Sequence, residues 1–128
     1  MASTVPFTLI TPSEIVFQGE AELVIAVTTE GEEGILPHHA PLLAALRPGI
    51  LRANVRRDGA TERLERATGR GFIQALPDRV TVLVDEALRF EDVDVARAKE
   101  ELAAAAGAGD RAAEAFAAAK LRLTGHQQ

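Results

Sequence analysis

Between residues 6 and 88, apolar residues recur at every second position in several short segments. Leu51, Ala53 and Val55 alternate with polar residues, and the segment 80–84 repeats that pattern. Such alternation is typical of β-strands that bury one face. The strands that we predict in this half of the chain are 7–10, 23–27, 42–46, 50–56, 61–68, 72–76 and 80–84.

Turn residues separate these predicted strands. Asp58-Gly59 is a strong hairpin signal, because both residues tolerate a positive φ. Gly19 and Gly31 bound the segment 23–27, and the segment 42–46 reads as a buried strand. Short strands with turns about every 8–12 residues indicate a sandwich or barrel. Since strands of this kind cannot bury both faces alone, we expect two sheets that pack face to face.

After Phe90 the apolar period changes to three and four. Asp92 is the expected N-cap of a first helix, which Gly107 and Gly109 would end, and Asp110 can cap a second helix. The short connection makes the two helices antiparallel neighbours. We therefore predict a β-sandwich domain over residues 1–88, followed by an antiparallel two-helix hairpin over residues 89–128. The apolar stripe predicted for the first helix is Val95, Ala98, Leu102 and Ala105, and that for the second is Ala112, Ala115, Phe116, Ala119 and Leu123.

Composition narrows the classes of function. The net charge of −5 argues against a nucleic-acid binder, which needs clustered basic residues. Cysteine is absent, which excludes disulfides and thiolate metal sites. No apolar run approaches the length of about 20 residues that spans a bilayer. We expect a soluble protein whose membrane association runs only through partners.

Two adjacent histidines are the most conspicuous candidates for chemistry. His38 and His39 lie between Pro37 and Pro41, shortly after the carboxylates of the segment 30–33. One reading is a metal site in a stand-alone β-sandwich enzyme or sensor. The other reading is a rigid surface loop, because adjacent side chains on an extended chain point in opposite directions and rarely bind one ion. Neither a G-x-S-x-G nor a phosphate-binding G-x-x-x-x-G-K-[ST] motif occurs.

The segment 34–42, "GILPHHAPL", with "LRPG" at 46–49, resembles the epsilon subunit of bacterial F-type ATP synthase. That family carries a G-x-x-P-x-H-A-P-L…L-x-P-G pattern, in which His39 takes the histidine position. The segments 16–19 and 80–83 match as well, so the resemblance covers nearly the whole chain. It implies the same fold, a β-sandwich followed by a helical hairpin.

The resemblance also implies a function. The family's sandwich sits at the foot of the central rotor stalk on the cytoplasmic face of the bacterial inner membrane. It binds the gamma subunit and the c-ring, and it catalyses nothing itself. Glu32 matches a family carboxylate in the loop that meets the c-ring, and Glu30, Gly31 and Glu33 flank it. Pro37 and His38 lie nearby, and they complete the interface that the resemblance predicts.

The helical hairpin of the family regulates ATP hydrolysis, and it can contact the alpha and beta subunits. Some members bind regulatory ATP through an aliphatic-Asp-x-x-Arg-Ala motif, which the segment 93–98 matches through Asp94 and Arg97. The resemblance implies Arg111 and Arg122 as basic partners on the second helix, and it implies no other cofactor. The alternative is a helix cap at Asp94 and an ordinary ion pair at Arg97. The second helix is short and weakly basic, which indicates weak inhibition.

Overall fold

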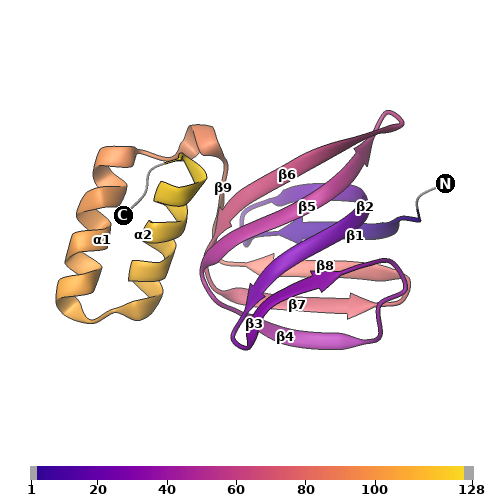
Figure 1. Ribbon diagram of the computed structural model, residues 1–128, viewed down its shortest axis with the longest axis horizontal. Helices are drawn as coiled ribbons and strands as arrows, with labels where there is room; N and C mark the ends of the chain where they lie inside the picture. Colours follow the sequence, from indigo (N-terminus) through magenta and orange to yellow (C-terminus); the bar gives the residue numbers. More distant parts are fainter. Residues whose placement is uncertain (1–2, 126–128) are drawn as a thin grey trace.

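The computed structural model describes residues 3–125, and Figure 1 shows a body of β-strands with two helices packed at one end. The predicted β-sandwich with a C-terminal helical hairpin is confirmed. The elements are β1 (Val5–Ile10), β2 (Ile15–Thr28), β3 (Gly31–Ile35), β4 (Leu42–Leu46), β5 (Gly49–Arg57), β6 (Ala60–Thr68), β7 (Gly71–Leu76), β8 (Arg79–Val84), β9 (Ala87–Leu88), the 3-10 helix η1 (Phe90–Asp92), α1 (Val95–Ala108) and α2 (Arg111–Leu123).

The long strand β2 connects the two layers. One layer contains β1, β8, β7 and β4, and the other contains β5, β6 and β9. β2 pairs with β1 along its first half, with β5 near its middle, and with β3 and β4 towards its end. The hydrogen bonding is therefore continuous from one layer to the other. The two expected sheets are one folded sheet, and within the first layer β1 pairs with β8 in parallel.

The core fills the space between the layers. Phe7 and Leu9 of β1 are fully buried, and the rings of Phe7 and Phe17 lie 5.7 Å apart. Val80 and Val82 of β8 are buried on the same inner face. Each such side chain contributes about 1.5–3 kcal/mol relative to an exposed one. The alternation seen in the sequence is thus the inner face of the sandwich.

Side-chain caps fix the helical hairpin. Asp94 accepts a hydrogen bond from the Arg97 amide, and Asp110 accepts one from the Ala113 amide. Gly109 ends α1 with φ 71°, the left-handed conformation that glycine favours at this position. Asp110 therefore caps α2, as the sequence predicted. The tight connection between α1 and α2 makes the two helices antiparallel neighbours.

α2 lies between α1 and the sandwich, against β5 and β6 (Figure 1). A near-buried Lys120 joins the helices through an ion pair with Glu101. The buried side chains of the hairpin are separate from the contiguous core of the sandwich. The docked hairpin thus forms a second apolar cluster, whose buried residues are Ala98, Ala105, Ala117, Ala119 and Leu121.

Several local predictions were wrong. Asp92 is the last residue of η1 and does not cap α1. The N-cap is Asp94, the residue directly before α1, whose carboxylate accepts a hydrogen bond from the Arg97 amide. Gly107 lies inside α1, and Gly19 lies inside β2, where it pairs with Phe7. On α2, Ala117 and Leu121 are buried in addition to Ala119, because the helix contacts both α1 and the sandwich.

The strand 42–46 is only half buried, which also differs from the prediction. Leu46 is buried, but Leu43 keeps 72% of its surface exposed. The strand belongs to one layer of the sandwich, so its two faces have different surroundings. Within residues 3–125, no helix is both long and apolar enough to cross a membrane.

Candidate partner-binding surfaces

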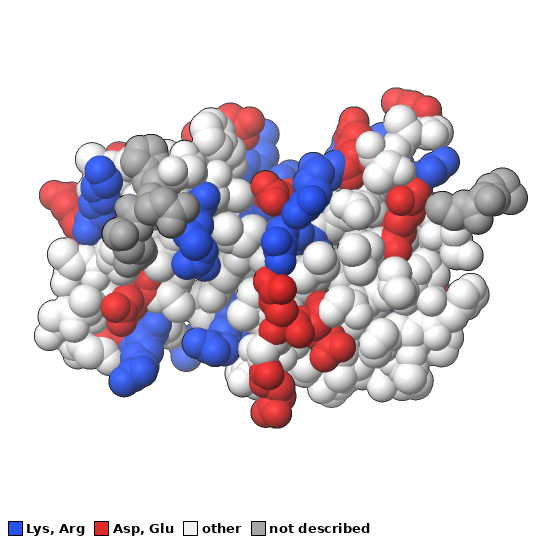
Figure 2. Space-filling view, viewed as in Figure 1, with Lys and Arg blue, Asp and Glu red and all other residues white. Residues whose placement is uncertain are grey.

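The predicted acidic loop is a β-hairpin between β2 and β3. Its turn contains Glu30, and Gly31 follows with φ 120°. The Thr28 hydroxyl donates to the Gly31 carbonyl oxygen at 2.7 Å and accepts from the Glu30 amide at 3.0 Å. These two bonds hold the turn in one conformation. On the face in Figure 2, acidic side chains gather over the region that β3 and its turn occupy in Figure 1.

Glu32 and Glu33 lie in strand β3, not in a loop, so their side chains point to opposite faces. Glu32 lies opposite Val27 and forms an ion pair of 2.6 Å with Arg52 of β5. Arg122, near the end of α2, lines the same pocket of about 190 Å3. Glu32 therefore faces the side of the sandwich on which the hairpin docks, whereas Glu33 shares the face of the buried Ile35.

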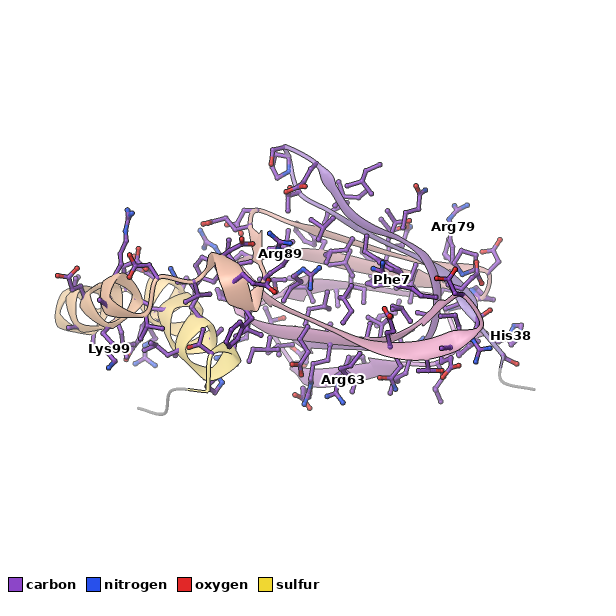
Figure 3. All side chains as sticks on the ribbon, turned by 90° about the horizontal axis from the view of Figure 1, so that it is seen from above. Phe7, His38, Arg63, Arg79, Arg89 and Lys99 are labelled. Carbon is purple, nitrogen blue, oxygen red and sulfur yellow. The ribbon has the colours of Figure 1, made fainter. Side chains whose placement is uncertain are left out.

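Pro37 and His38 form a separate turn at the other end of β3. The His39 amide donates to the Leu36 carbonyl oxygen at 3.2 Å, which closes a β-turn with Pro37 and His38 at its centre. His38 has φ 67°, as a type II turn requires at its third position. β3 is about 17 Å long, so the structure does not bring His38 together with the acidic turn. In Figure 3, His38 lies at the end of the sandwich away from the helices.

The two histidines do not form a metal site together with the neighbouring carboxylates. No group of three or more His, Asp or Glu side chains in the described part of the chain is placed to bind one ion. The His39 Nδ1–H donates to the Ala40 carbonyl oxygen, so this ring nitrogen is engaged in a hydrogen bond. The geometry is that of a proline-braced surface turn.

An uncharged outer face on β1, β8, β7 and β4 was missed by the sequence analysis. Phe72 lies directly opposite Leu83, and both are more than half exposed, as is Leu43 on β4. Strand register places the neutral Gln74 and Thr81 next to them on the same face. Apart from Leu76 and the charged Arg79 beside the β7–β8 turn, the outward positions of these strands within the paired segments are Thr8, Ile10, Leu43, Ala45, Phe72, Gln74, Thr81 and Leu83. We call these residues the neutral face.

The neutral face has the character of a binding surface. Large apolar side chains that lie exposed next to one another often mark interaction sites on soluble proteins. The sequence contained an indication of this face, because Leu43, Phe72 and Leu83 are large apolar residues at strand positions where a polar residue is expected. It could not be read as a patch, because β1 and β4 meet β8 and β7 only through pairing across distant parts of the chain.

The residues of the predicted nucleotide site are only partly assembled. Asp94 and Arg97 line a pocket of about 290 Å3 with Lys120 and Glu101. Arg97 lies 3.6 Å from Glu101, which also pairs with Lys120. Arg111 starts α2 and therefore lies at the opposite end of the hairpin, about 16 Å along the helix from Arg122. Arg122 itself lines the pocket with Glu32 instead.

Comparison with known proteins identifies the family. Residues 4–90 match the model of the ATP synthase delta/epsilon chain β-sandwich domain. An ATP synthase epsilon chain of Chromobacterium violaceum is 41% identical over 112 residues, which cover 88% of this chain and 79% of that one. The chain belongs to the ATP synthase delta/epsilon family. It is accordingly a non-catalytic subunit of an enzyme complex rather than an enzyme by itself.

For other epsilon chains the match with this chain covers a smaller share of the relative's length. The epsilon chain of Dehalococcoides mccartyi strain BAV1 is 45% identical over 72% of this chain, but the match spans 63% of that relative. The matched family range ends within η1, so the proposed domain boundary after residue 88 stays a prediction.

Solved structures share the fold of this epsilon-family chain. A chain in the Euglena gracilis mitochondrial ATP synthase, a structure of OSCP, F1 and the c-ring, has a TM-score of 0.68 at 25% identity. The match covers 95% of this chain and 78% of the Euglena chain. A chain from the central stalk and c-ring of the Tetrahymena thermophila enzyme has a TM-score of 0.58 at 16% identity, covering 87% and 94% of the two chains.

Proposed function

We propose that this chain is a rotor-stalk subunit that couples rotation of a c-ring, through gamma, to the catalytic head of an F-type ATP synthase. Membership of the delta/epsilon family is the observation that carries the proposal. The subunit belongs to a membrane-associated complex, and we place it on the cytoplasmic face of the bacterial inner membrane, held there by its partners.

We propose the neutral face as the docking surface for gamma. Torque transmission requires a contact that persists while the rotor turns, and burial of large apolar side chains supplies most of the free energy of such contacts. Phe72 and Leu83 lie side by side on a strand pair whose inner face is part of the rigid core. Charged residues are costly to desolvate, and the charged outward residue of β8, Arg79, lies at the strand end away from Leu83.

The acidic β2–β3 hairpin is the proposed contact with the c-ring. Glu30 extends from a turn whose backbone Thr28 braces, and its carboxylate can pair with basic or amide groups. Gly31, Glu32 and Glu33 continue this contact along β3. Pro37 and His38 lie at the other end of the strand and form a second proposed contact on the same subunit.

The hairpin is the proposed regulatory element, with regulatory ATP binding at Asp94 and Arg97. Arg122 lies at the same end of the hairpin, but ATP binding would require it to leave its pocket beside Glu32. Arg111 could contribute only after a larger rearrangement. Contacts between an extended hairpin and the alpha and beta subunits belong to the same proposal, and the weakly basic α2 would give only weak inhibition of hydrolysis.

A binding assay with recombinant gamma tests the proposed function. We expect the chain to form a stable complex, and Phe72→Gln to weaken it about tenfold or more, as for a central interface residue. Phe90→Gln is the matched control, since Phe90 is also more than half exposed but lies on η1. The proposal would be contradicted if no complex formed at micromolar concentration, or if Phe90→Gln weakened binding and Phe72→Gln did not.

A further inference from the structure

A pocket of about 430 Å3 lies where β6, η1 and the end of α2 meet. Its wall contains three arginines, two glutamates and two apolar side chains. Beyond the short pairing with β9 at residues 67 and 68, the outer edge of β6 has no strand partner in the described chain. The pocket straddles this edge, and its lining residues are Arg63, Glu65, Arg66, Arg89, Phe90, Glu91 and Leu123.

Among the arginines of this pocket, Arg66 is the one without an ion pair in the described residues. Arg63 lies 3.6 Å from Glu65, and Arg89 lies within ion-pair distance of both Glu91 and Asp92. Arg66 forms no ion pair with any carboxylate of the described residues. Its Nη1 donates to the Glu65 carbonyl oxygen at 2.9 Å. Arg63 and Arg89 are thus paired with carboxylates, whereas Arg66 is not.

The Arg66 guanidinium also has an unsatisfied donor. Its Nε is buried and has no hydrogen-bond acceptor among the described residues. A buried donor without an acceptor is destabilising, more so when the group carries a charge. Burial lowers the pKa of Arg66, and the nearby positive charge of Arg89 lowers it further. Arginine still remains charged at neutral pH, so an anion that reaches the guanidinium would offset this charge.

We propose that this pocket binds a phosphate group, with Arg66 as its principal ligand and Arg63 and Arg89 as supporting cations. Guanidinium groups present paired N–H donors that match phosphate oxygens. Phe90, which is 59% exposed, and Leu123 provide an apolar wall for the organic part of a phosphate ester. The site is separate from the pocket of Asp94 and Arg97.

Occupancy of this site favours the docked hairpin. Arg63 and Arg66 belong to the sandwich, Arg89 and Phe90 to the connection, and Leu123 to the hairpin. A ligand that contacts all three parts binds the docked arrangement more tightly than an arrangement that lacks the Leu123 wall. It therefore stabilises docking by mass action.

The test is calorimetric titration of the isolated full-length chain with inorganic phosphate at constant ionic strength. We expect saturable one-site binding, which Arg66→Gln weakens at least about tenfold. Arg79→Gln removes the same charge at the far end of the sandwich (Figure 3) and should leave binding unchanged. If Arg66→Gln fails to fold, Arg63→Gln on the exposed face of β6 should weaken binding in the same direction.

A second titration, with a nucleoside monophosphate, separates free phosphate from a phosphate ester as the ligand. Tighter binding that Phe90→Ser reduces and Arg97→Gln leaves unchanged assigns an ester to this pocket, and equal binding of both probes assigns free phosphate. Unsaturable binding, or equal phosphate binding by wild type and both pocket variants, overturns the proposal. Because no partner subunit is present, this outcome is independent of gamma binding.

Discussion

The backbone of His38 is held in the left-handed region, with φ 67°, within a turn that Pro37 begins. An L-residue other than glycine costs about 1–2 kcal/mol in this conformation. Asp58 has φ 51° in the β5–β6 turn, and both aspartate and histidine tolerate this region better than most residues. The strain persists because β3 and β4 fix both ends of the segment.

We predict that His38→Gly stabilises the chain by about 0.5–1 kcal/mol. Glycine removes the strain, but its greater freedom in the unfolded chain offsets part of the gain. Urea denaturation measures the change, and His38→Ala serves as the control that keeps a Cβ and should gain little. A less stable His38→Gly variant would show that the imidazole makes a compensating contact.

Asp92 gives a second prediction at this scale. Arg89 donates to its carboxylate from the backbone N, Nε and Nη2 atoms and holds the pKa of Asp92 below its usual value. The stabilisation is complete above the unfolded pKa of about 3.9 and is lost as the pH falls through the lower folded value. We expect Asp92→Asn to flatten the loss of thermal stability below about pH 4. Asp78→Asn, in the β7–β8 turn, is the control, and identical pH profiles for Asp92→Asn and wild type would contradict this assignment.

At the scale of elements, the sequence predicted those turns and helix caps that depend only on neighbouring residues. Asp58-Gly59 and Asp110 were assigned from the sequence, since a turn or a cap needs only neighbouring residues. Asp92 was wrongly chosen over Asp94, because both precede the apolar periodicity and only Val93 separates them. The neutral face was missed for a different reason. It depends on the pairing of β4 with β7 and of β1 with β8, which no single segment encodes.

The two caps of the hairpin provide a matched pair of substitutions. Asp94→Ala and Asp110→Ala each remove one bond to a helix amide, so each should destabilise its helix by about 1 kcal/mol. Of the two carboxylates, the proposed ATP site contains only Asp94. We expect Asp94→Ala to abolish ATP-induced thermal stabilisation and Asp110→Ala to retain it. Loss in both variants, or in neither, would contradict a nucleotide role for Asp94.

At the scale of the whole molecule, the chain combines a continuous folded sheet with a hairpin that has its own apolar cluster. Departure of the hairpin would leave the contiguous core of the sandwich intact, because the buried residues of the hairpin lie outside it. This arrangement suits a subunit whose rigid part transmits force while a separate part regulates. The periodicities of the sequence predicted both parts, but they could not show that α2 is the helix that contacts the sandwich.

Coupling through the neutral face is the central claim, and ATP-driven proton pumping tests it most directly. Vesicles that carry an ATP synthase depleted of its epsilon subunit would be supplied with wild-type chain, Phe72→Gln or Phe90→Gln. We predict that wild type and Phe90→Gln restore pumping at the same concentration, whereas Phe72→Gln needs about tenfold more. Failure of the wild-type chain to restore pumping, or equal restoration by Phe72→Gln at every concentration, would contradict the account.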